Sequence, residues 1–109
     1  MAFVRACSLA SLTPGAPMRV EVDGLDVAIV LDGGEVFAIE DECSHAAVAL
    51  SEGDVDDCTI ECWLHGSRFD LRTGEPTGLP ATEPVATFAV EIRDGDLYVS
   101  TTPSNGVNP

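Results

Sequence analysis

Lysine is absent from the sequence, and arginine supplies all 5 basic residues against 19 acidic ones. The formal charge of -14 disfavours nucleic acids and anionic membranes as partners, because a surface of that sign repels both. No apolar run approaches the ~20 residues that a membrane-spanning helix needs, and no charged-then-apolar signal pattern opens the chain. We therefore expect a cytoplasmic protein whose partners are proteins with basic docking faces.

Long helical periodicity is also missing. Short strand-like segments are separated by Asp-Gly and Gly-Gly turns, which favour two-residue hairpins because both turn positions accept a positive φ. After a loop over residues 8–17, this spacing predicts an all-β fold, a small antiparallel sandwich or barrel. We expect one domain over residues 1–102 and a flexible tail over 103–109. The expected strands cover residues 3–6, 18–22, 27–31, 36–39, 59–62, 69–71, 87–92 and 97–100.

The two histidines each lie within three residues of a cysteine. Cys43–His45 and Cys62–His65 form two chelating patterns, C-x-H and C-x-x-H, with 16 residues between them. Small residues beside both patterns allow the backbone to curl, so that the two side chains of a pattern can face one point. Together the patterns offer two thiolates and two imidazoles, which are enough to close a metal site.

Two kinds of metal centre suit these four donors. A zinc-stabilised interaction domain would use them in tetrahedral geometry, but zinc fingers place like ligands in pairs. The mixed order found here favours a two-iron cluster in which one iron takes both cysteines and the other takes both histidines. A mononuclear oxygenase iron is excluded by counting, because it needs two further histidines and the chain has only two in all.

These motifs resemble those of a Rieske-type ferredoxin. The likeness runs from the first strand to about residue 100 and includes residues 43–45, 62–67, 69–70, 73–74 and a proline-containing loop that ends at residue 84. It implies one 2Fe–2S cluster per chain, held by two loops at one tip of the β domain. By the same resemblance Cys43 and Cys62 would bind the inner iron, and His45 and His65 would bind the outer iron near solvent.

The resemblance also assigns residues around the cluster. Ser67 stands where a serine hydroxyl hydrogen-bonds cluster sulfur, whereas Phe69 replaces a tyrosine donor of the respiratory branch. Val48 and Leu64 replace two cysteines that form a disulfide in that branch, so apolar contact between the loops is expected instead. Pro80 belongs to the loop that would cover the third side of the cluster. The missing donor predicts a potential in the lower part of the band of about −150 to +300 mV.

Three further side chains have two interpretations each. Trp63, between the expected ligands of the second pattern, would shield that loop or lie on a docking surface, and shielding is favoured. Cys7 and Cys58 would be small buried hydrophobic residues rather than further ligands or a redox pair. Cys58 shares strand parity with Ile60 and Cys62, which predicts that its side chain faces inward.

Acidic residues crowd the first pattern. Part of this run is a solvated face, and the remainder would steer a partner with a basic patch, which speeds encounter more than it tightens binding. The run consists of Glu40, Asp41, Glu42, Glu52, Asp54, Asp56, Asp57 and Glu61.

The resemblance implies an electron carrier with no catalytic reaction of its own. It would pass single electrons from an NAD(P)H-dependent flavoprotein reductase to a non-haem iron oxygenase of the ring-hydroxylating type. Two redox alternatives are the small Rieske-like subunit of an NAD(P)H nitrite reductase and an accessory electron carrier in iron–sulfur cluster assembly. The zinc-stabilised interaction domain is the non-redox alternative.

Overall fold

The computed structural model describes residues 3–44, 48–64, 66–79 and 81–107. These residues form short strands and two 3-10 helices, and no helix among them is long and apolar enough to cross a bilayer. The elements in chain order are β1 (Phe3–Ser8), η1 (Leu9–Ser11), β2 (Met18–Val22), β3 (Leu25–Asp32), β4 (Glu35–Glu40), η2 (Leu50–Glu52), β5 (Val55–Asp56), β6 (Thr59–Glu61), β7 (Arg68–Asp70), β8 (Thr87–Arg93) and β9 (Asp96–Pro103).

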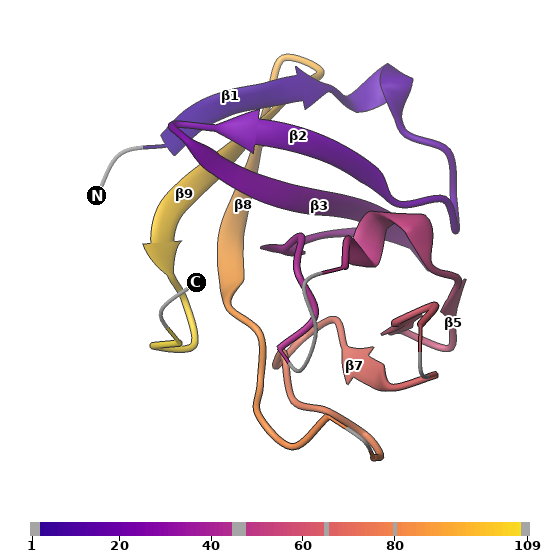
Figure 1. The fold of residues 1–109 in the computed structure, drawn as a ribbon. Coiled ribbons are helices and arrows are strands. Elements are labelled where there is room, and N and C mark those ends of the chain that lie inside the picture. Colours follow the sequence, from indigo (N-terminus) through magenta and orange to yellow (C-terminus); the bar gives the residue numbers. More distant parts are fainter. Residues whose placement is uncertain (1–2, 45–47, 65, 80, 108–109) are drawn as a thin grey trace.

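Two antiparallel sheets make up the fold. The larger sheet has the order β1-β9-β8-β4-β3-β2, and its two edge strands lie beside each other, so the sheet curls into a nearly closed barrel (Figure 1). The smaller sheet has the order β5-β6-β7 and lies at one end of the barrel. This arrangement confirms the prediction of an all-β antiparallel fold.

The hairpins of the barrel form where the sequence predicts them. The turns at Asp23–Gly24, Gly33–Gly34 and Asp94–Gly95 all have positive φ at both positions, between 50° and 84°. Two positive φ values give a two-residue turn the twist that neighbouring strands need. These three turns set the register of the strand pairs β2–β3, β3–β4 and β8–β9.

The smaller sheet contains a hairpin that the sequence analysis missed. β5 and β6 are joined by Asp57 and Cys58, which have φ values of 50° and 60° although neither is glycine. The parity argument for Cys58 is therefore wrong, because this residue lies in the turn and not in the strand. Its side chain nevertheless packs, partly buried, against the apolar core around Ile60.

The core has two parts. One fills the barrel and includes Val27, Ile29 and Val99, all at most 1% exposed. The other lies between the barrel and the smaller sheet, and it contains both Cys43 and Cys62. The two expected cysteine ligands thus lie within packed apolar surroundings and not on a detached loop.

Residues 103–107 contact the barrel. β9 continues to Pro103, the Ser104 N–H donates to Thr87 O at 2.7 Å, and Val107 packs against the barrel core. These contacts extend past the expected boundary at residue 102. The flexibility of residues 103–109 stays a prediction.

Candidate metal centre

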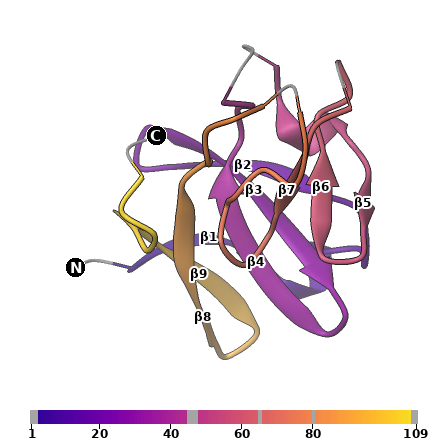
Figure 2. The ribbon, with the colours of Figure 1, turned by 90° about the horizontal axis from the view of Figure 1, so that it is seen from below.

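Three loops meet at one end of the molecule (Figure 2). The first follows β4, the second joins β6 to β7, and the third runs from β7 to β8. Hydrogen bonds link the third loop to both others: Ser44 Oγ donates to Glu83 O at 2.6 Å, and Ala81 N–H donates to Ser67 Oγ at 3.0 Å. These hydrogen bonds hold the third loop against the first and the second.

The first and second loops are built alike around their cysteines. Cys43 N–H donates to Val48 O at 3.0 Å, and Cys62 N–H donates to Ser67 O at 2.6 Å. In each loop the bond joins the cysteine amide to the carbonyl five residues further on, which closes a tight loop. The second closure is helped by Gly66, whose φ of +80° places it in a region that favours glycine.

Both cysteine side chains are buried, Cys43 at 3% and Cys62 at 0% exposure, and both belong to one apolar cluster. Two soft sulfur donors from separate loops in apolar surroundings suit the cysteine half of an iron–sulfur centre. His45, His65 and Pro80 lie outside the described residues. Within the described ranges, no three His, Cys, Asp or Glu side chains gather in a way that could hold a metal ion.

Ser67 is placed as a polar group inside this apolar region. It is 1% exposed, and its Oγ accepts the hydrogen bond from Ala81. A hydroxyl that accepts in this way keeps its own proton for a further acceptor. This arrangement fits the role that the family resemblance assigns to Ser67, donation to a cluster sulfur.

The aromatic and aliphatic residues of the two loops are placed differently from one another. Val48 packs partly buried against the core that holds the cysteines, whereas Leu64 is 43% exposed. Trp63 is 51% exposed, which favours a place on a docking surface over the shielding role expected from the sequence. Phe69 is fully buried in the same core.

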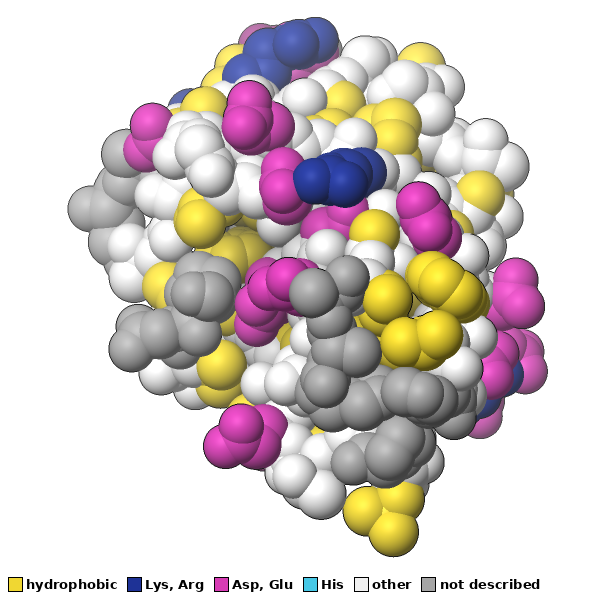
Figure 3. All heavy atoms as spheres, in the orientation of Figure 1, with side chains coloured by type: hydrophobic (Ala, Val, Ile, Leu, Met, Phe, Trp, Pro, Cys, Tyr) yellow, Lys and Arg dark blue, Asp and Glu magenta, His cyan; other side chains and the backbone are white. Residues whose placement is uncertain are grey.

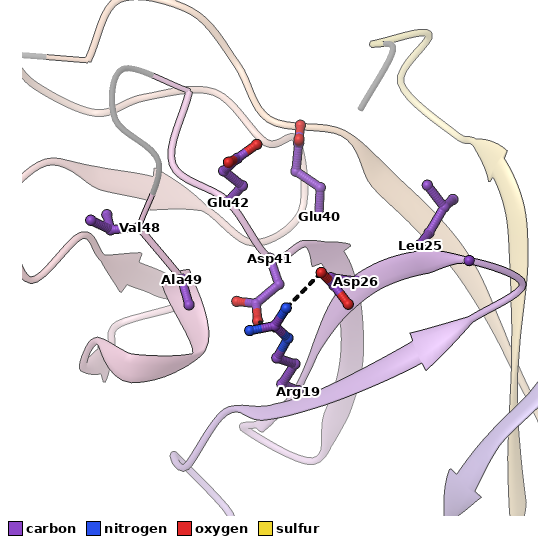
Figure 4. Close-up of a pocket in the computed structure, with 9 residues that line it drawn as sticks. Arg19, Leu25, Asp26, Glu40, Asp41, Glu42, Val48 and Ala49 are labelled. Atoms are coloured by element: carbon purple, nitrogen blue, oxygen red, sulfur yellow. Dashed lines mark hydrogen bonds and ion pairs between the residues drawn. The ribbon is translucent and has the colours of Figure 1, made fainter.

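Asp41 has a structural role in the first loop that its place in the acidic run of the sequence did not indicate. Its side chain is fully buried and accepts hydrogen bonds from Ser51 N–H at 2.6 Å and Ser51 Oγ at 2.8 Å. Arg19 Nε lies 3.6 Å from the same carboxylate, and Figure 4 shows Asp41 pointing toward Arg19 while Glu40 and Glu42 point away. The pair Asp41–Ser51 therefore clasps the two ends of the first loop. A carboxylate and a serine ten residues apart carry no local signal that would reveal such a clasp.

Replacing Asp41 by asparagine tests this clasp. The amide can accept only through one oxygen, and its NH2 group faces a donor, so we expect a loss of about 1–3 kcal/mol in the free energy of unfolding. Urea unfolding of the cluster-loaded protein measures the change. Glu42→Gln is the matched control, since this substitution also removes one negative charge but at an exposed neighbouring residue. Equal stability of the two variants would contradict a stabilising role of the Asp41–Ser51 hydrogen bonds.

The remaining cysteines have no sign of a ligand role. Cys7 and Cys58 are partly buried thiols outside any disulfide. Burial raises the pKa of both thiols. Both side chains pack, partly buried, against the apolar core, and their role as small packing residues stays a prediction.

Known proteins share this architecture. Residues 2–89 match the family described as the Rieske [2Fe-2S] domain. The ferredoxin component of biphenyl 2,3-dioxygenase from Rhodococcus jostii (strain RHA1) is 42% identical over 99 residues, which cover 91% of this chain and 92% of that protein.

Solved structures agree with this match. The ferredoxin of carbazole 1,9a-dioxygenase from Nocardioides aromaticivorans IC177 is 41% identical, with a TM-score of 0.87 over 92% of this chain and 98% of that one. A chain in a complex of reduced oxygenase and oxidized ferredoxin of carbazole 1,9a-dioxygenase is 36% identical, with a TM-score of 0.84 over 90% of this chain and 92% of that one. The chain therefore belongs to the Rieske [2Fe-2S] domain family and binds one 2Fe–2S cluster.

Proposed function

We propose that this protein carries single electrons from a flavoprotein reductase to the terminal oxygenase of a ring-hydroxylating dioxygenase system. The observation that carries the proposal is the pair of closed cysteine loops at one end of the barrel, in a chain similar over nine-tenths of its length to ferredoxin components of dioxygenases. The bound cluster supplies one-electron redox chemistry. Oxygen activation is left to the partner, since the two histidines of this chain are both needed by the cluster.

The ligand set is part of the proposal. Cys43 and Cys62 would hold the inner iron, and their burial supports this assignment because it keeps water from the sulfurs. His45 and His65 would hold the outer iron, supported by their places in the same two loop sequences. Neutral imidazoles in place of two thiolates make the cluster less negative, which raises its potential and suits it to accept an electron from a flavin.

The docking surface that we propose consists of Trp63, Leu64 and Leu79. These apolar side chains of the second and third loops are 51%, 43% and 80% exposed. Exposed apolar groups of this size are typical of interaction sites, and Trp63 and Leu64 directly follow Cys62 in the second loop. A partner that covers them would come close to the cluster, as electron transfer requires.

Acidic groups around this surface would select the partner by charge. Glu42 and Glu83, in the first and third loops, are exposed, and Figure 3 shows acidic side chains spread over the face that it draws. Complementary charge raises the rate of encounter more than the affinity. We therefore propose that the reductase and the oxygenase present basic faces. Unpaired thiols at Cys7 and Cys58 support a location in the cytoplasm, where disulfides are rare.

Electron transfer from the reductase is expected to slow steeply as salt is added. We expect the second-order rate to fall by about tenfold or more between about 20 mM and 500 mM NaCl, because exposed charges are screened over a shorter distance. Stopped-flow reduction of the cluster with NAD(P)H and the flavoprotein measures this rate. A second mixing step with oxidised oxygenase tests whether the electron is passed on.

Two charge-neutralising variants locate the effect. The double variant Glu42→Gln and Glu83→Gln should reduce the salt dependence, whereas Asp94→Asn, in the turn at the opposite end of the barrel, should leave it unchanged. A rate that does not vary with salt would contradict the proposal that the acidic groups steer the reductase. A reduced cluster that the oxygenase fails to reoxidise would refute the proposed function itself.

A further inference from the structure

The third loop leaves the fold through a narrow neck. Val85 N–H donates to Gly74 O at 2.9 Å. Between these two residues the loop also bonds to β7, since Asp70 N–H donates to Glu75 O at 2.9 Å and Thr77 N–H donates to Arg68 O at 2.8 Å. At this neck the backbones of Gly74 and Val85 lie so close together that a Cβ atom on Gly74 would overlap Val85 O. The same Cβ atom would approach Asn105 Nδ2 to 2.8 Å. Gly74 also has a φ of +78°, so glycine is required there by both space and backbone conformation.

The Asn105 side chain spans this neck. Its Nδ2 donates to Thr73 O at 3.0 Å and to Val85 O at 2.9 Å, one carbonyl on each side. Its Oδ1 accepts from Thr87 N–H and from Val107 N–H, each at 3.2 Å. Both donors and both acceptor sites of the amide are thus directed at backbone groups. A residue beyond the last strand thus joins the base of the third loop to the barrel.

The far part of the third loop lies against the cluster loops. Ala81 N–H donates to Ser67 Oγ, and the carbonyl of Ser67 closes the loop of Cys62. The carbonyl of Glu83 accepts from Ser44 Oγ in the first loop. The position of the third loop therefore bears on both loops that hold the cluster, and it sets where the Ser67 hydroxyl points.

We propose that Asn105 is a positioning residue for the cluster: by closing the neck it keeps the third loop seated, and so keeps Ala81 bonded to Ser67. Without the amide, the two carbonyls of the neck lose their donor and the loop opens more often. Each opening admits water to the cluster side of Ser67 and frees its hydroxyl to rotate. The proposal rests on the cluster-binding site and not on the identity of the redox partners.

The test compares Asn105→Ala with two control variants of the cluster-loaded protein. Ser104→Ala removes only the neighbouring hydroxyl contact with Thr87, at 2.7 Å. Val99→Ala creates a cavity in buried β9, which lowers stability without touching the neck. We expect Asn105→Ala alone to release iron to a chelator about tenfold faster, because local opening exposes the cluster, and to change the g values of the reduced cluster in EPR.

Three outcomes would overturn the proposal. The first is iron release and g values in Asn105→Ala equal to those of the unchanged protein, and the second is the same changes in Val99→Ala, which would mean a general loss of stability. If Asn105→Ala does not fold, hydrogen exchange of the unchanged protein decides. If the Ala81 and Val85 amides exchange in one concerted opening, the result supports the coupling of the neck to the Ala81–Ser67 bond. Independent exchange of the two amides is the third overturning outcome. Absence of a cluster from the unchanged protein would instead refute the site.

Discussion

Replacing Cys62 by alanine is expected to yield a protein that holds no 2Fe–2S cluster. The side chain is fully buried, and the Cys62 amide closes the second loop, so no other thiol can move into its place. Cys43→Ala is expected to give the same result. Iron and acid-labile sulfide per chain, together with the visible absorption of the reconstituted protein, measure the loss. We expect the content to fall from one cluster to none.

The two other cysteines supply controls of the same chemistry. Cys7→Ala and Cys58→Ala remove thiols that are partly buried, have a raised pKa and lie outside the closed loops. Both variants should keep a full cluster with an unchanged EPR signal. A cluster that survives in Cys62→Ala, or one that is lost in Cys58→Ala, would show that the ligand set is assigned incorrectly.

Gly53→Ala is expected to destabilise the protein and displace the second loop. A Cβ atom at this position would overlap the carbonyl oxygen of Glu61, which directly precedes Cys62. Because the obstacle is backbone, it cannot turn aside as a side chain would. We expect a loss of about 3 kcal/mol in the free energy of unfolding, at the upper end of overpacking effects, accompanied by poor cluster incorporation.

Gly78→Ala is the matched control for this substitution. Gly78 has no atom within 4 Å of an added Cβ and does not have a positive φ, so the methyl group should be tolerated. Thermal unfolding and iron content of the two variants give the comparison. Equal stability of the two would mean that the approach of Gly53 to Glu61 is not a constraint on the fold.

The sequence predicts the barrel well because its turns are encoded locally. The Asp-Gly and Gly-Gly pairs favour positive φ values by their residue types, and the structure has such values there. The strands on either side follow from the alternation of apolar and polar residues. The cysteine and histidine motifs were equally visible, since metal ligation needs fixed residue types at short spacings. Both features depend on neighbours in the sequence.

Features that depend on distant residues were missed. The β5–β6 hairpin uses the Asp57–Cys58 turn without glycine, and tertiary contacts hold it, including the bond from Cys58 N–H to Asp32 Oδ2 at 3.0 Å. The Asp41–Ser51 clasp and the bonds from Asn105 Nδ2 likewise join residues 10 or more apart. A single sequence records the residues of such contacts but not the contacts themselves.

The near closure of the barrel bears on how the protein behaves when it is concentrated. Strands β1 and β2 lie beside each other, and the edges of the smaller sheet, β5 and β7, are only two and three residues long. Intermolecular β-pairing, the first step of many aggregation routes, needs a long free row of backbone donors and acceptors. The part of the chain that the structure describes offers few such rows, and repulsion between like-charged copies adds to the protection. An electron carrier built in this way is protected against pairing with its own copies at high concentration.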